Sequence, residues 1–284
     1  MKRSIVITGV STGIGYGATM EFIKHGYHVF GSVRKPEDAV KLKKEFGEDF
    51  TPLIFDITNQ KSVIESAKLV EEKLEGKGLA GLINNAGAAQ GAPLMHMPIE
   101  VFRQHLEVLV VGQLIVTQAF LPLLGAKKNC SFRPGKIINI SSINGKMPAP
   151  FIGGYVASKY ALEGLSKTLR IELQLYGIDV IIVGPGIIKT PIWDKAEEIS
   201  FEPYRNTDYY EPYQSFSKFV KKMIVSEGYE VDLFSKKLVK IFERKNIKTR
   251  YAIVRGKFIN WTLPLLLPSR ILDRFYANKL KFKR

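Results

Sequence analysis

Short apolar runs alternate with longer amphipathic stretches along most of the chain. The first run, residues 4–9, consists mostly of β-branched and aliphatic residues, and apolar positions then recur at helical spacing over residues 15–25. Strands buried on both faces have continuous apolar sequences, and strand–helix alternation is typical of a parallel sheet with helices on each side. The pattern therefore predicts an α/β fold with a doubly wound parallel sheet. The other predicted strands lie at 27–33, 51–57, 81–87, 135–142 and 178–186, and the other predicted helices at about 36–46, 62–74, 99–124 and 155–176.

Nothing in the composition divides this pattern into separate units. No Pro/Gly/Ser-rich linker, low-complexity segment or internal repeat interrupts it. A chain of 284 residues that is 45% apolar can also bury a large core. We therefore expect one domain over residues 1–255.

The formal net charge of +15 raises the question of an anionic partner. Lys and Arg are spread along the chain, with higher density after residue 218, and no zinc-finger spacing or RNA-binding aromatic motif accompanies them. We expect most of these charges to be solvated surface, and we expect no nucleic-acid partner and no metal site. Cys130 is the single cysteine, and the sequence starts with a strand instead of a charged and apolar leader, so the cytoplasm is the expected compartment.

A glycine-rich turn follows the first predicted strand and precedes the first predicted helix. Its sequence, Thr8-Gly9-Val10-Ser11-Thr12-Gly13-Ile14-Gly15, departs from the general G-x-G-x-x-G pattern. Glycines permit a tight turn and a close approach of the backbone to phosphate, and a helix N-terminus offers free N–H groups with partial positive charge. In this setting the turn predicts a pyrophosphate-binding loop of the dinucleotide type.

The residues after the second predicted strand bear on which dinucleotide binds. This position commonly holds an acid in proteins that bind NAD and a base in proteins that bind NADP. Here it holds Arg34 and Lys35, and Ser32 could add a hydrogen bond. A forked guanidinium and an ammonium suit a 2′-phosphate, so NADP(H) is favoured over NAD(H). The alternative is that both bases are ordinary surface cations.

Three residues could form a proton-transfer centre. Tyr155 and Lys159 are four residues apart in a predicted helix and share a face, so the ammonium could favour the phenolate of a tyrosine whose ordinary pKa is about 10. Ser142 could hold a substrate oxygen while Tyr155 donates or removes a proton. A Tyr-x-x-x-Lys pair alone is a common accident on helix surfaces.

The ordered motifs together resemble the short-chain dehydrogenase/reductase family over residues 3–195, particularly its hydroxysteroid and retinol dehydrogenase-like branch. They are the TGVSTGIG turn, Asp56 after the third strand, Asn84-Asn85-Ala86-Gly87, Ser142, Tyr155 with Lys159, and Pro185-Gly186 with Thr190. Ser142 is matched, and Ser141 is not, because Ser142 lies thirteen positions before Tyr155, as in the family. The resemblance implies a Rossmann fold and an NAD(P)-dependent oxidoreductase that interconverts a secondary alcohol with a ketone or aldehyde.

The same resemblance assigns roles to individual positions. It implies that Tyr155 is the general acid/base, that Lys159 lowers the Tyr155 pKa and holds the nicotinamide ribose, and that Ser142 positions the substrate oxygen. Ile188 and Thr190 would contact the nicotinamide amide. Asn84 and Asn85 could instead bond the backbone at a strand end, and Pro185-Gly186 could be a simple turn. The expected cofactor-binding residues are Gly9, Ser11, Thr12, Gly13, Ile14, Gly15, Arg34, Lys35, Asp56, Ile57, Asn84, Asn85, Ala86, Gly87, Tyr155, Lys159, Pro185, Gly186, Ile188 and Thr190.

One position departs from the family pattern. The family commonly has an asparagine three residues before the glycine that here is Gly112, and it supports a water in a proton relay; this chain has Leu109 there. A leucine side chain cannot hydrogen-bond water, so the relay must be altered or served by another group. A second interpretation therefore stays open, in which the protein is an NADP(H)-binding sensor or scaffold with weak turnover.

The chain becomes rich in aromatic residues after Thr190, where the family places a mobile substrate lid, here at about 191–225. Aromatic side chains bury large areas with few rotatable bonds. They favour a bulky apolar substrate, such as a steroid, a retinoid or a long-chain ketone, with Trp193 as a substrate-binding candidate beside Ser142 and Tyr155. The alternative is that they pack the lid against the domain or a second subunit. They are Trp193, Phe201, Tyr204, Tyr209, Tyr210, Tyr213, Phe216 and Phe219.

The final segment, 256–284, combines an apolar run at 258–268 with a basic amphipathic stretch. The run is shorter than the roughly 20 residues that a membrane-spanning helix needs. It could lie in the interface of an anionic membrane, or it could fold over the substrate site or onto a second subunit, as tails of soluble relatives do. The family resemblance also implies a homodimer or homotetramer, formed through the helices that contain Gly112 and Tyr155.

Overall fold

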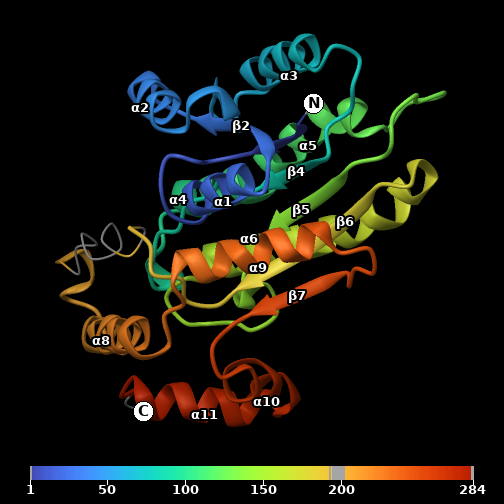
Figure 1. The fold of residues 1–284 in the computed structure, drawn as a ribbon. Helices are drawn as coiled ribbons and strands as arrows, with labels where there is room; N and C mark the ends of the chain where they lie inside the picture. The colour runs from blue at the N-terminus through green and yellow to red at the C-terminus, as the bar shows by residue number, and fades with distance from the viewer. Residues whose placement is uncertain (1, 192, 194–201, 283–284) are drawn as a thin grey trace.

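A computed structural model describes residues 2–191, 193 and 202–282 of the chain. Within this part, seven parallel strands form one sheet in the order β3-β2-β1-β4-β5-β6-β7 (Figure 1). The order reverses between β1 and β4, which is the crevice where open α/β sheets bind ligands. The strands are β1 (Arg3–Ile7), β2 (Tyr27–Val33), β3 (Phe50–Ile54), β4 (Gly81–Asn84), β5 (Lys136–Ile140), β6 (Asp179–Pro185) and β7 (Arg250–Ile253).

Helices cover both faces of the sheet, so the predicted doubly wound fold is confirmed. The core on one side contains Phe22, Leu42 and Phe234, and the core on the other side contains Val70, Phe120 and Leu169. The first group comes from α1 (Gly13–Lys24), α2 (Pro36–Phe46) and α9 (Val231–Glu243), and the second from α3 (Gln60–Leu74), α5 (Gly112–Phe120) and α6 (Gly153–Glu172).

Strand β7 was not predicted from the sequence. It has only four residues, it lies at the edge of the sheet, and three of its side chains are half-buried. A short edge strand therefore lacks the continuous apolar run that identified the inner strands. Its pairing with β6 nevertheless places Arg250 beside Ile182.

The predicted helix at 99–124 is one continuous rod that combines α-helical, π-helical and 3₁₀ turns. It runs from α4 (Ile99–Leu106) through a π-helical turn, η3 (Glu107–Val111), into α5 and a final 3₁₀ turn. By length and composition Ile99–Leu124 could cross a membrane. Val116 and Phe120 from this rod are, however, fully buried in the core against the sheet, as expected for a core helix of a globular protein.

The lid region and the C-terminal extension share a small core of their own. Helix α8 (Tyr210–Glu227) lies near the extension, which forms the π-helical turn η8 (Phe258–Thr262), α10 (Leu263–Leu266) and α11 (Ser269–Lys279) (Figure 1). Leu280, at the end of the extension, is fully buried with Phe151 and Tyr213. The extension therefore packs back onto the domain that precedes it.

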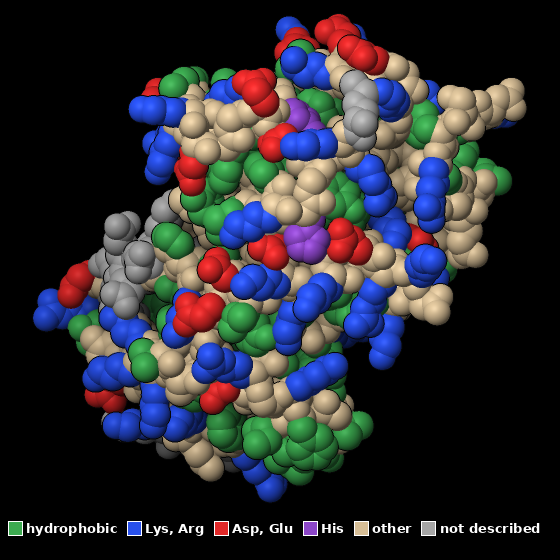
Figure 2. All heavy atoms as spheres, viewed as in Figure 1, with side chains coloured by type: hydrophobic (Ala, Val, Ile, Leu, Met, Phe, Trp, Pro, Cys, Tyr) green, Lys and Arg blue, Asp and Glu red, His purple; other side chains and the backbone are tan. Residues whose placement is uncertain are grey.

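Charged side chains are distributed over the face that Figure 2 shows. Lys and Arg are mixed with Asp and Glu there and do not gather into one large basic patch. The charges on this face are thus spread over solvated surface.

Candidate functional site

A cavity of about 2410 Å³ extends from the loop after β1 to helices α8, α10 and α11. It lies at the carboxyl ends of the strands, where the connecting loops of a doubly wound sheet converge. Three of the residues predicted from the sequence, Gly15, Lys35 and Asn84, do not line it. The predicted residues that do line it are Gly9, Ser11, Thr12, Gly13, Ile14, Arg34, Asp56, Ile57, Asn85, Ala86, Gly87, Ser142, Tyr155, Lys159, Pro185, Gly186, Ile188, Thr190 and Trp193.

The turn after β1 depends on its glycines. Gly9 and Gly13 have φ of +69° and +62°, in the left-handed region that favours glycine. A Cβ on Gly9 would lie 2.9 Å from the Ala86 Cα, and a Cβ on Gly15 would lie 2.1 Å from the Gly9 carbonyl oxygen. Gly15 thus allows the first turn of α1 to pack under the loop. The helix then points its free N–H groups at the cavity, as a pyrophosphate requires.

The two bases after β2 are placed differently. Arg34 lines the cavity, whereas Lys35 is an exposed residue at the N-cap of α2. Ser32 is buried and its Oγ accepts a hydrogen bond from the Gly9 N–H at 3.0 Å. Arg34 is therefore the better placed of the two predicted bases to meet a 2′-phosphate, with Ser32 joining this edge of the cavity to the glycine loop.

The asparagines after β4 have separate structural partners. Asn85 Nδ2 donates to the Thr8 and Gly9 carbonyl oxygens at 2.9 and 3.1 Å. Asn84 is fully buried and donates to Thr117 Oγ1 and Asn139 Oδ1, both at 2.9 Å. Backbone bonding is thus found for Asn85, which also faces the cavity, while Asn84 joins neighbouring elements inside the core.

Asp56 and Ile57 form another wall of the cavity, beyond β3. Asp56 Oδ1 accepts hydrogen bonds from the Thr58 backbone N–H at 2.9 Å and from the Thr58 hydroxyl at 2.7 Å. A Cβ on Gly112 would lie 2.9 Å from Ile57 Cγ1. The side chain of Asp56 is thereby oriented locally, and Gly112 lets the central helix approach this wall.

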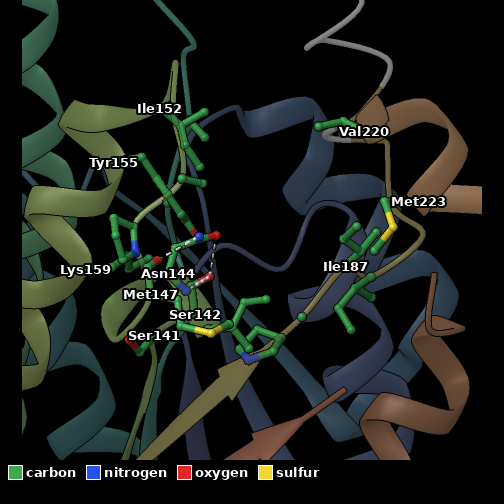
Figure 3. Close-up of a pocket in the computed structure, with 18 of the residues that line it drawn as sticks. Ser141, Ser142, Asn144, Met147, Ile152, Tyr155, Lys159, Ile187, Val220 and Met223 are labelled. Atoms are coloured by element: carbon green, nitrogen blue, oxygen red, sulfur yellow. Dashed lines mark hydrogen bonds between the residues drawn. The ribbon is translucent and has the colours of Figure 1, made fainter. Parts of the chain in front are cut away.

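The three proton-transfer candidates come together at the end of β5 and the start of α6 (Figure 3). Ser142 follows β5, and its Oγ accepts a hydrogen bond from the Asn144 N–H at 3.1 Å. Lys159 is buried, its Nζ donates to the Ile140 carbonyl oxygen at 2.8 Å, and it lies 5.6 Å from the centroid of the Tyr155 ring. The helical spacing thus places both side chains on one face of α6, next to the end of β5 that Ser142 follows.

The pKa of Tyr155 is higher than that of a free tyrosine. Burial raises it, and the hydrogen bond with Ser142 opposes that rise. Burial lowers the pKa of Lys159 to about 8, against the opposing effect of the nearby Glu163 carboxylate. Desolvation of the phenol sets the direction of the Tyr155 shift, and the lowering of the Tyr155 pKa by Lys159 stays a prediction.

Leu109 occupies the position where the family commonly has an asparagine. It lies in the π-helical turn η3, is 1% exposed and lines the cavity. Its Cδ2 would be 3.0 Å from a Cβ on Gly87. The leucine is thus packed against the loop after β4 at the edge of the cavity, where it presents no hydrogen-bonding group to water.

Residues after β6 form a further wall of the cavity, close to the glycine loop. The Trp193 indole N–H donates to the Ile188 carbonyl oxygen at 2.7 Å. A Cβ on Gly13 would lie 3.4 Å from the Thr190 side chain, so this segment crosses close to the first turn of α1. Trp193 is thereby anchored at the cavity.

The other predicted lid aromatics divide between two roles. Tyr213, Phe216 and Phe219 line the cavity. Tyr204 and Tyr209 pack in the small core around Phe151 and Tyr213, which supports the packing interpretation for them. Phe201 lies outside the described residues, and Tyr210 begins α8 without lining the cavity.

Several site residues were missed at the level of sequence. Val220 and Met223 of α8 lie across the cavity from Tyr155 (Figure 3). Glu163 and Arg250 form a buried ion pair of 2.8 Å beneath Ser142. Glu163 is one turn beyond Lys159 on the same helix, which was an available signal, but Arg250 is 87 positions away and no local pattern connects it to the site.

Known proteins share both the sequence and the fold. The sequence profile of the family described as short chain dehydrogenase matches residues 3–199. The chain belongs to the short-chain dehydrogenase family. An NADPH-dependent 3-dehydrocapnine reductase of Ornithobacterium rhinotracheale is 39% identical over 279 residues, 98% of each protein. Mouse estradiol 17-beta-dehydrogenase 2 is 31% identical over 239 residues, 79% of this chain and 59% of that protein.

Solved short-chain dehydrogenases also have the same architecture. A short-chain dehydrogenase from Burkholderia cenocepacia, crystallised with NADP, has a TM-score of 0.73 and 23% identity, and the match covers 97% of each chain. At this identity the likeness shows the fold. With the family match, it makes this short-chain dehydrogenase an oxidoreductase with a nucleotide-binding Rossmann fold, similar to the hydroxysteroid and retinol dehydrogenase branch.

Proposed function

We propose that this chain reduces a ketone on a bulky or long-chain apolar substrate to a secondary alcohol, with NADPH as the hydride donor. The observation that carries the proposal is the cavity, which joins Arg34 and the glycine loop at one end to Ser142 and Tyr155, and then to the apolar faces of α8 and the extension. The NADPH-dependent relative that is 39% identical over almost the whole chain supports both the cofactor and the direction.

The residues present suit NADP(H). Gly9 and Gly13 keep the loop free of side chains where the backbone must approach a pyrophosphate. Arg34 brings a guanidinium to the end of the cavity beyond β2. When bound, the cofactor would supply a hydride to the carbonyl carbon.

Three side chains would manage the substrate oxygen. Ser142 would donate its hydroxyl hydrogen to the ketone oxygen, and Tyr155 would transfer its phenolic proton to the same oxygen as negative charge develops there. Lys159 is mostly protonated at neutral pH with a pKa of about 8, and its charge would stabilise the phenolate that remains.

The protonation state of Tyr155 is compatible with proton donation. A tyrosine with an ordinary pKa of about 10 is protonated at neutral pH, and burial raises the Tyr155 pKa further. Tyr155 can therefore give a proton to a ketone oxygen.

The size and lining of the cavity support a large apolar substrate. Its volume of about 2410 Å³ exceeds the roughly 300–1,000 Å³ of an ordinary ligand pocket, which leaves room for a dinucleotide and a second large molecule. Beyond the serine and tyrosine its walls are mainly aliphatic and aromatic. These walls include Val220, Met223, Ile224, Leu263, Leu272, Phe275 and Tyr276.

A substrate screen with purified protein tests the proposal. We expect NADPH absorbance to fall with 3-dehydrocapnine, which the relative's name gives as its substrate, or with a long-chain ketone, and more slowly with NADH in place of NADPH. Retinal and a steroid ketone distinguish a flat substrate from a linear one. Tyr155→Phe is the matched control, because it removes only the phenolic oxygen. Full activity in that variant would refute the proton-transfer role. Tight NADPH binding without turnover of any ketone would favour the sensor or scaffold interpretation that Leu109 motivates.

A second candidate function, contact with an anionic membrane surface, is favoured by the outer side of the extension. Phe258, Ile259 and Leu266 are 67%, 67% and 74% exposed, and Figure 2 shows hydrophobic side chains at the lower edge of the molecule, where Figure 1 places α10. Basic residues surround them in the sequence, which suits an interface of anionic lipid. These are Arg255, Lys257, Arg270, Arg274, Lys279 and Lys281.

Vesicle co-sedimentation tests this contact. We expect the protein to pellet with vesicles that contain anionic phospholipid at low salt, and less with vesicles of phosphatidylcholine alone. Leu266→Glu should weaken pelleting, whereas the exposed Val40→Glu on α2 should not. Absence of pelleting at low salt would exclude the membrane proposal.

Exposed apolar side chains on α6 and the central rod suit a contact with a second copy of the chain. Tyr160, Ile171 and Leu175, along α6 and the 3₁₀ turn after it, are 42%, 61% and 80% exposed, and Val111 on the central rod is 43% exposed. We propose that a second copy covers these helices in a homodimer or homotetramer, which sedimentation equilibrium tests. A cytoplasmic location agrees with the use of NADPH, and cell fractionation tests it.

A further inference from the structure

A buried ion pair lies directly beneath the serine loop. Arg250 on β7 donates from Nε to both carboxylate oxygens of Glu163 on α6, at 2.8 and 3.1 Å. The two side chains are only 16% and 2% exposed. Another nitrogen of the same guanidinium, Arg250 Nη2, donates to the Ser142 carbonyl oxygen at 3.0 Å. One side chain thus joins the sheet edge, the helix of Tyr155 and Lys159, and the backbone of Ser142.

Neighbouring residues hold this arrangement in place. The Ser141 hydroxyl donates to Glu163 Oε1 at 3.1 Å. A Cβ on Gly184 of β6 would lie 2.5 Å from Arg250 Nη2, and a Cβ on Gly145 would lie 2.9 Å from Glu163 Cγ. The two glycines leave the space in which the guanidinium and the carboxylate meet.

The C-terminal extension covers the arginine. The Arg250 guanidinium carbon lies 4.4 Å from the centroid of the Trp261 ring, in the π-helical turn η8. This distance suits a cation–π contact. The extension is therefore linked to the serine loop through the Arg250 guanidinium, and it also lines the far end of the cavity.

We infer that Arg250 is a positioning residue for the proposed ketone reduction: held by Glu163 and covered by Trp261, it holds the Ser142 carbonyl and so aims the Ser142 hydroxyl at the substrate oxygen. The inference rests on the proposed function of Ser142. Arg250 is well suited to this task, because its planar fork can bond a carboxylate and a second acceptor in one fixed geometry, which an ammonium cannot. Displacement of a catalytic group by about 1 Å can cost about 100-fold in rate.

A simpler role must be separated from this one. Arg250 could serve only to neutralise Glu163, since a buried carboxylate without a partner destabilises a fold. The double variant Glu163→Gln with Arg250→Met removes both charges and leaves no unpaired ion. The new glutamine side chain can still accept a hydrogen bond from the Ser141 hydroxyl, but the new methionine side chain cannot donate to the Ser142 carbonyl. The variant therefore tests the donor to Ser142 apart from the ion pair.

The expected result is a loss of kcat without a loss of cofactor binding. We expect kcat of the double variant for the best ketone to fall by about 10–100-fold, with the NADPH dissociation constant and the midpoint of urea unfolding close to those of the wild type. Arg250→Lys, which keeps a charge beside Glu163 but loses the fork, should also lower kcat. Arg244→Met is the matched control, because Arg244 is exposed and also lies over an aromatic ring, at 6.0 Å from the centroid of Tyr251.

The outcomes distinguish the two proposals. A double variant with kcat within twofold of the wild type would overturn the positioning role of Arg250 and leave the ketone reduction standing. Tyr155→Phe, measured in the wild-type background, tests the chemistry separately. A double variant that loses kcat and NADPH affinity together would also contradict the inference, because the serine loop would then not be the element that changed.

Discussion

Lys159 is expected to destabilise the folded protein, and the variant Lys159→Met should therefore be more stable than the wild type. Burial lowers its pKa from 10.5 to about 8. The unfolded chain therefore binds the Lys159 proton more tightly than the folded chain, and holding the ammonium in the folded state costs about 3 kcal/mol at pH 7. The cost falls as pH rises from about 8 to 10.5, because the unfolded chain then loses the same proton, and it is about 1.5 kcal/mol at pH 9.5.

The variant Lys159→Met removes this cost and adds a smaller one. Methionine keeps most of the apolar stem but cannot donate to the Ile140 carbonyl, a loss of about 1 kcal/mol that does not depend on pH. We expect the variant to be more stable than the wild type by about 2 kcal/mol at pH 7 and by about 0.5 kcal/mol at pH 9.5. Turnover should fall by about 100-fold or more, because the charge beside the tyrosine is gone.

Urea unfolding at the two pH values measures the effect, at one protein concentration because assembly changes apparent stability. Lys68→Met on the exposed side of α3 is the control, and it should change stability little and equally at both pH values. The reasoning would be refuted by a stability difference between Lys159→Met and the wild type that is the same at pH 7 and pH 9.5. It would also be refuted by a variant that is less stable at pH 7.

Three further substitutions test separate parts of the site. Arg34→Glu should raise the NADPH dissociation constant by about 10–100-fold and leave that of NADH nearly unchanged, as measured by cofactor fluorescence. Lys35→Glu, outside the cavity, should change either dissociation constant by less than about threefold. Equal effects of the two substitutions would contradict the placement of the 2′-phosphate at Arg34. Leu109→Asn should raise kcat by up to about tenfold if the proton relay limits turnover, and an unchanged kcat in stopped-flow assays would show that it does not. Gly15→Ala should destabilise the protein by about 2 kcal/mol, because the new Cβ would meet the Gly9 carbonyl oxygen. Gly164→Ala should not destabilise it, because the space around Gly164 on α6 is open. Similar melting temperatures for the two variants would contradict the packing argument.

The sequence alone was enough for six of the seven described strands, the glycine loop and the pairing of Tyr155 with Lys159. These features depend on short-range physics. A strand buried on both faces must be continuously apolar, a phosphate loop must contain residues without side chains at particular places, and residues four apart in a helix share a face whatever surrounds it. The family motifs then placed Ser142 beside the pair, although it comes from a different element.

The tertiary structure decided which of several equivalent residues reach the site. Arg34 and Lys35 are adjacent bases, and Asn84 and Asn85 are adjacent amides. The direction of each side chain at the strand end decides whether it reaches the cavity, the surface or the core. The rise of the Tyr155 pKa also comes from the tertiary structure, because desolvation depends on everything packed around the phenol. Arg250 joins the site from a strand without a distinctive pattern, across 108 positions from Ser142. Contacts at that separation arise only when the sheet is assembled, so no local pattern in the sequence could predict them.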